Sequence, residues 1–65
     1  MNRASTLARE TLAEAAQYRP GTEDHEYRLR AAWNQAQMGA GIPACDWTDP
    51  PTGFGPHWLH ERTAA

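Results

Sequence analysis

The chain has 65 residues, which suffices for a single small domain over 1–65 but not for a second core. Its formal charge is −2, with eight carboxylates, six arginines and no lysine, which argues against a general attraction to nucleic acid or anionic membranes. One cysteine excludes an internal disulfide, and no apolar run has the length of a secretion signal or a membrane span. We therefore expect a cytoplasmic protein.

Large aliphatic side chains are scarce, because Leu, Ile, Val and Phe together number six. Such a composition is typical of disordered chains, but the low net charge, three Trp and two Tyr favour a folded domain. We expect its stability to be marginal or to depend on a partner.

The first predicted element is a helix over 4–19, a range without glycine or proline. Asn2 or Ser5 could cap its start, and Pro20-Gly21 should end it. Small and apolar residues recur at helical spacing: Ala4, Leu7, Ala8, Leu12, Ala15 and Tyr18. The short turn that follows predicts an antiparallel second helix.

The second predicted helix covers 22–39 and begins at Thr22, a favourable N-cap. The acidic side chains of its first turn complement the positive end of the helix dipole: Glu23, Asp24 and Glu26. Two acid-first pairs have the i,i+4 spacing of stabilising ion pairs: Asp24 with Arg28, and Glu26 with Arg30.

The apolar stripe of this second helix is also rich in alanine: Leu29, Ala32, Trp33, Ala36 and Ala40. Gly39 and Gly41 should terminate the helix in the left-handed conformation. Two alanine-rich stripes approach closely but leave little side-chain volume in the seam between the helices.

The C-terminal third of the chain carries the bulk that the helices lack, interleaved with proline: Trp47, Phe54, Trp58 and Leu59. We predict that this segment covers the seam as a lid, with Trp33 and one of Trp47 or Trp58 in the core, and that a short third helix spans 56–63 from Pro56. No β-branched run is present, so the predicted class is an all-α helical hairpin with a C-terminal cover.

A zinc site is one alternative, because His57 and His60 have i,i+3 spacing and Cys45 could supply a further ligand. The spacing matches no established zinc motif, so we predict neither a metal nor another cofactor.

A DNA-binding helix-turn-helix is a further alternative, since the second helix carries Arg28, Arg30 and Asn34. Its acidic start would face phosphates, which argues against this alternative. Catalysis by Cys45 with a histidine lacks any fixed geometry, so we expect no enzyme.

Protein binding is the leading hypothesis, because Trp, Tyr and Arg outnumber aliphatic residues, as they do at interface hot spots. The predicted partner surface comprises Glu23, Asp24, Glu26, Arg28, Arg30, Trp47 and Phe54. The partner would be a larger protein, for which the chain acts as an inhibitor or adaptor, or a second copy of the chain. A short, lysine-free chain rich in alanine and arginine fits a GC-rich bacterium or its phage, where small inhibitors such as anti-CRISPR proteins act in this way.

Overall fold

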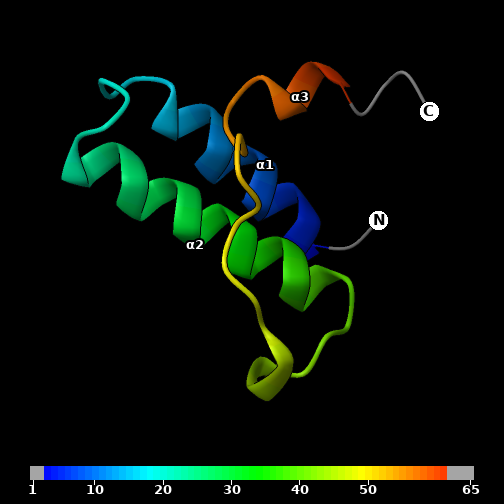
Figure 1. The fold of residues 1–65 in the computed structure, drawn as a ribbon. Coiled ribbons are helices and arrows are strands. Elements are labelled where there is room, and N and C mark those ends of the chain that lie inside the picture. The colour runs from blue at the N-terminus through cyan, green and yellow to red at the C-terminus, as the bar shows by residue number, and fades with distance from the viewer. Residues whose placement is uncertain (1–2, 62–65) are drawn as a thin grey trace.

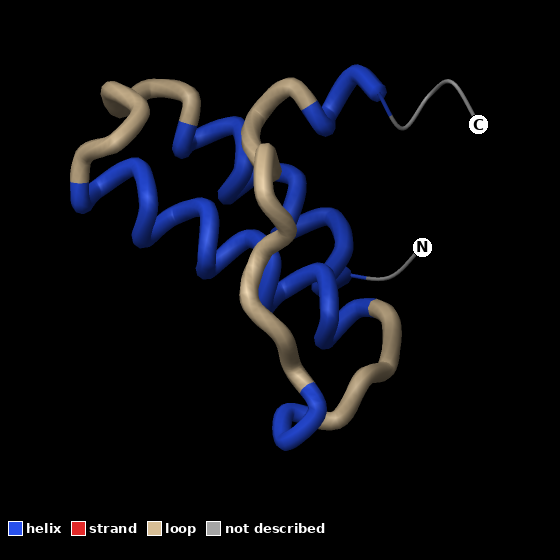
Figure 2. Tube along the Cα trace, in the orientation of Figure 1, coloured by secondary structure: helices blue, strands red, loops and turns tan. Residues whose placement is uncertain are grey.

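The computed structural model describes the backbone of residues 3–61 and the side chains of residues 6–59. Its helices are α1 (Arg3–Ala15), α2 (Glu23–Gly39), the short 3-10 helix η1 (Ala44–Asp46) and α3 (Trp58–Glu61). Helices α1 and α2 pack against each other in antiparallel directions (Figure 1). Figure 2 shows the loop after η1 running back across α2 towards α3. Residues 3–61 contain no strand, which confirms the predicted all-α hairpin.

Helix α1 ends at Ala15, four residues before the predicted end. The chain continues in tight i→i+3 turns, in which the amides of Ala16, Gln17 and Tyr18 donate to the third carbonyl back. Such turns satisfy carbonyls at a helix end as the chain tightens ahead of Pro20, which disfavours helical backbone at the preceding residue. Ser5 lies inside α1 and is therefore not its cap, whereas Asn2 lies outside the described residues.

Both ends of α2 have the predicted capping residues. The Thr22 hydroxyl accepts from the His25 amide at 3.3 Å and donates to the Arg19 carbonyl at 2.7 Å. At the other end Gly41 has a φ of 82°, and the amides of Gly41 and Ile42 donate back to Met38 and Gln37 in a Schellman motif. Of Gly39 and Gly41, only Gly41 adopts the left-handed conformation, because α2 extends through Gly39.

The third helix begins two residues later than predicted. Pro56 and His57 belong to a turn in which the Trp58 amide donates to the Gly55 carbonyl at 2.9 Å, and α3 begins only at Trp58. The described part of α3 ends at Glu61, and the predicted last residues, 62 and 63, lie outside the described residues.

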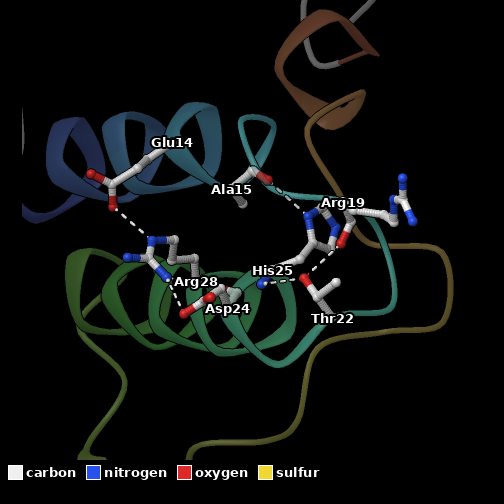
Figure 3. Close-up of polar contacts among 7 residues, drawn as sticks. All are labelled: Glu14, Ala15, Arg19, Thr22, Asp24, His25 and Arg28. Carbon is white, nitrogen blue, oxygen red and sulfur yellow. Dashed lines mark hydrogen bonds and ion pairs between the residues drawn. The ribbon is translucent and has the colours of Figure 1, made fainter.

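A buried histidine joins the two long helices. His25, 6% exposed, directs Nδ1 at the Ala15 carbonyl, the last of α1, over 2.8 Å (Figure 3). A carbonyl oxygen can only accept, so Nδ1 carries the hydrogen and donates it. The first turn of α2 therefore caps the end of α1, which the sequence pattern did not indicate.

The core between α1 and α2 consists mainly of alanine, as the stripes predicted. The buried apolar residues are Ala8, Leu12, Ala15, Leu29 and Ala32, and Phe54, Trp58 and Leu59 pack against them from the C-terminal segment. Other predicted stripe residues depart from this pattern: Leu7 is 46% exposed and Ala40 is exposed, whereas Tyr18, Trp33 and Ala36 are only half-buried. In the described part of the chain, no large side chain is fully buried.

Gln37 attaches the returning loop to α2. Its amide oxygen accepts from the Thr48 backbone amide at 2.7 Å, and its amide nitrogen donates to the Thr48 carbonyl at 3.1 Å. The Gln37 side chain, 4% exposed, thus pairs with the loop as a neighbouring strand would. This clamp sets where the aromatic C-terminal segment crosses the hairpin.

Replacing Gln37 with Ala should lower the free energy of unfolding by about 1 to 3 kcal/mol, because both backbone groups of Thr48 lose their partner. Gln35→Ala is the matched control, since the Gln35 amide oxygen is buried without a hydrogen-bond partner among the described residues. We expect it to cost clearly less in urea unfolding followed by circular dichroism. Equal losses for the two variants would show that the clamp contributes nothing specific.

Replacing His25 with Ala should destabilise the fold by about 1 to 3 kcal/mol, because the Ala15 carbonyl loses a buried donor. His25→Asn keeps a short side-chain N–H near the position of Nδ1 and should recover part of the loss. Thermal unfolding of the two variants gives the comparison. An Asn variant as unstable as the Ala variant would mean that ring packing, not the hydrogen bond, joins the helices.

Candidate binding groove

Three aromatic rings form a cluster on the face of the hairpin crossed by the C-terminal segment. Their centroids are 5.2 Å apart for Trp33 and Phe54, 5.0 Å for Phe54 and Trp58, and 6.2 Å for Trp33 and Trp58. All three pairs meet edge to face, the arrangement that the ring quadrupoles favour. Each ring is only half-buried, so the cluster packs on the core and also presents apolar surface.

Local turns place the two C-terminal rings. The Phe54 amide donates to the Pro51 carbonyl at 3.0 Å in a turn whose Gly53 has a φ of 88°. That positive φ strains residues with a Cβ, so glycine suits the position. A second turn, closed by the Trp58 amide on the Gly55 carbonyl, then directs the chain into α3. The prolines and glycines of this segment thus fix ring positions that have little regular secondary structure to hold them.

An apolar groove of about 350 Å³ opens beside the cluster, between α1, α2 and the C-terminal segment. Its lining is almost wholly aliphatic and aromatic, and the exposed Arg9 supplies the one charged side chain among the lining residues. The lining residues are Ala8, Arg9, Leu12, Ala32, Trp33, Ala36, Phe54, Trp58 and Leu59. We call this surface the aromatic groove.

A second, smaller hollow of about 230 Å³ continues the apolar surface along α2. It shares Trp33 and Ala36 with the aromatic groove and extends to Ala40 and Ile42, with Asp46 also in its lining. The Trp33 indole nitrogen is directed at the Thr48 hydroxyl at 3.5 Å, which orients the ring between the two hollows. The aromatic groove and this second hollow therefore form one continuous apolar surface, which is larger than a single side chain of a partner would cover.

The predicted partner residues do not gather in one place. Phe54 lies in the aromatic groove, whereas Trp47 is half-buried and its indole nitrogen donates to the Ile42 carbonyl at 2.9 Å. The acidic cluster of Glu23, Asp24 and Glu26 is exposed at the start of α2. Sequence reasoning missed Arg9 as a groove residue, because its position reads as the polar face of a helix, and assigned Trp33 to the core.

Arg28 was expected to be exposed, and this expectation was wrong. Its side chain is 23% exposed, and its guanidinium carbon lies 4.0 Å from the centroid of the Tyr18 ring. The guanidinium pairs with Glu14 at 3.1 Å and with Asp24 at 3.5 Å (Figure 3). Partial desolvation lowers the pKa of Arg28, but Tyr18, Glu14 and Asp24 together raise it above its ordinary value. The cation is thus engaged within the hairpin, which weakens both the partner role and the base-reading role predicted for it.

Arg30 is exposed, and the ion pair predicted for it with Glu26 is not formed among the described residues. Of the two arginines assigned to a partner surface, Arg30 therefore remains accessible.

The residues of the zinc alternative show no ligand cluster in the described region. Cys45 is exposed on η1 and His57 is exposed in the turn before α3, whereas the His60 side chain lies outside the described residues. Among the described side chains, no three of His, Cys, Asp or Glu lie close enough to hold a metal ion. Nor does the described chain include a helix whose length and apolarity would let it cross a membrane.

Comparisons with known proteins give no family assignment. No protein-family model matches this chain, and no curated protein or solved structure is significantly similar to it.

Replacing Trp58 with Ala should lower the free energy of unfolding by about 2 to 3 kcal/mol, less than for a fully buried tryptophan because the ring is half-exposed. Trp47→Ala is the matched control. It removes an indole of the same size that lies outside the cluster and should cost about 1 kcal/mol for its hydrogen bond. Denaturant unfolding measures both, and a larger loss for Trp47 would contradict the role given to the cluster.

Proposed function

We propose that this chain is a non-enzymatic protein-binding domain that acts as an inhibitor or adaptor of a larger protein. The observation that supports it is the aromatic groove, where Trp33, Phe54 and Trp58 remain half-exposed around an apolar hollow. Tryptophan-rich pockets of this kind are where interface hot spots concentrate. A short helical chain with such a surface suits a bacterial or phage inhibitor that works by covering part of its target.

The groove's chemistry indicates the kind of segment that it takes. Its floor is apolar and aromatic, which suits a large aliphatic or aromatic side chain from the partner. Arg9 at the lining provides a guanidinium that pairs with a carboxylate. We therefore propose that the partner supplies an apolar anchor with an acidic residue beside it.

Two other features support binding over catalysis. Cys45 is exposed on η1, and among the described side chains no three of His, Cys, Asp or Glu could hold a metal ion. The acidic cluster at the start of α2 and the exposed Arg30 would then serve as peripheral charged contacts, which tune association rates more than affinity.

Peptide-display selection against the purified protein tests the groove. Selected peptides should combine a large apolar residue with Asp or Glu, and Arg9→Glu should weaken their binding by about tenfold or more, because an attraction becomes a repulsion. Arg19→Glu is the matched control, since Arg19 is an exposed arginine of the turn between α1 and α2 and is not part of the groove lining.

The same pair of variants can be used in affinity capture from the native host. A genuine partner should be recovered stoichiometrically with the wild type and Arg19→Glu, and be depleted with Arg9→Glu. Selected peptides without acidic residues, or captured proteins insensitive to Arg9, would count against the proposed groove.

A further inference from the structure

The outer face of α2 carries a second apolar feature, separate from the aromatic groove. Tyr27 is 71% exposed and Met38 is 56% exposed, the two largest exposures among the big apolar residues described. Between them lie Ala31 and Asn34, so the four residues are spaced four, three and four apart. This is the spacing of a coiled-coil seam, and we call these residues the outer stripe.

The large residues at the ends of the outer stripe lie on the side of α2 that faces away from α1 and from the aromatic groove. At 100° per residue the stripe points roughly opposite to Trp33 and Ala36, which line the aromatic groove. The side towards α1 is occupied by Ala32 and by Arg28 with its Glu14 pair. The two ends of the stripe, Tyr27 and Met38, are therefore exposed, whereas Ala31 and Asn34 between them are half-buried and Asn34 Oδ1 accepts from the Gln37 amide nitrogen at 3.5 Å.

The structure assigns this face to a second copy of the chain, packed antiparallel through α2. The stripe is self-complementary in that direction, because Tyr27 opposite Met38 and Ala31 opposite Asn34 share one midpoint, between Ala32 and Trp33. A two-fold axis through this midpoint makes each of the two residue pairs occur twice in the interface, as in any isologous dimer. Each end gains a sulfur–aromatic contact.

A hollow beside Tyr27 supports the same pairing. It has a volume of about 350 Å³ and is lined by the turn before α2 and by Glu23, Glu26, Tyr27 and Arg30. In the antiparallel pair the flexible Met38 side chain of the second copy reaches this end of α2 and can fill the hollow. The exposed thioether thus has a matching recess at the position that the symmetry specifies.

The charge distribution selects the antiparallel direction. All five charged residues of α2 lie in its first half, from Glu23 to Arg30, and the second half has none. A parallel pair would place the acidic cluster against its own copy, which like-charge repulsion opposes. The antiparallel pair sets each charged half against an uncharged one, and the two helix dipoles oppose each other favourably.

Sedimentation equilibrium from micromolar to millimolar protein tests the association. The wild type should show a monomer–dimer equilibrium, and Met38→Glu should raise the dimer dissociation constant by about tenfold or more. The side chain at position 38 is exposed, so replacing Met38 with Glu should leave the helical circular dichroism unchanged. Leu7→Glu is the matched control, because it changes an exposed apolar residue on α1 in the same way and should leave the constant unchanged.

The relative direction of the two α2 helices in the dimer is measured with a nitroxide spin label. The label is attached to the exposed Cys45, which lies just beyond the C-terminal end of α2. Labelled wild type is mixed with ¹⁵N Cys45→Ser protein. The antiparallel pair predicts attenuated amide signals at residues 22–28 of the ¹⁵N copy.

Attenuation at 38–47 would indicate a parallel pair, and attenuation at 54–59 would indicate association through the aromatic groove. Either result would overturn this proposal, as would a strictly monomeric wild type. None of these results depends on the partner segment proposed for the groove, so the two proposals can fail separately.

Discussion

The constraint that governs this structure is the alanine-lined seam between α1 and α2. Alanine lets the two backbones approach closely but buries little apolar area for each residue ordered. Among the described residues, no large side chain is fully buried, so the hairpin alone has little to offset its conformational entropy. Contacts outside the seam must supply the balance, and they come from buried polar side chains and from the half-buried aromatic rings.

The polar contacts are placed where the helical hairpin has backbone groups to satisfy. His25 donates to the last carbonyl of α1, and Gln37 pairs with both backbone groups of Thr48. Each net hydrogen bond contributes modestly, and loss of the His25 bond would also leave the carbonyl of the buried Ala15 without its donor. These two residues therefore fix geometry more than they add stability: His25 sets how the helices meet, and Gln37 sets where the loop crosses.

The local features of the fold could be predicted from the sequence because they depend on near neighbours. Helical spacing located both long helices, and Thr22 and Gly41 were identified as caps from residue type alone. Individual side-chain contacts between segments could not be predicted in this way. Arg28 pairs with Glu14 across the hairpin in addition to Asp24 on its own helix, and nothing in the spacing of the sequence indicates that partner. The groove was missed for a similar reason. Helical spacing places Trp33 on the apolar stripe but does not tell whether other segments cover its ring completely or only in part.

The half-covered rings link the stability of this domain to the binding role proposed for it. A chain with so few aliphatic residues must use tryptophan and phenylalanine to cover its core, and rings of that size extend past an alanine seam into solvent. The surface that completes the fold is then the surface left for a partner. A segment seated in the aromatic groove would bury the exposed parts of Trp33, Phe54 and Trp58 and stabilise the folded state by mass action. The marginal stability that we expect and the open apolar groove therefore have the same cause, which is the small volume of the seam.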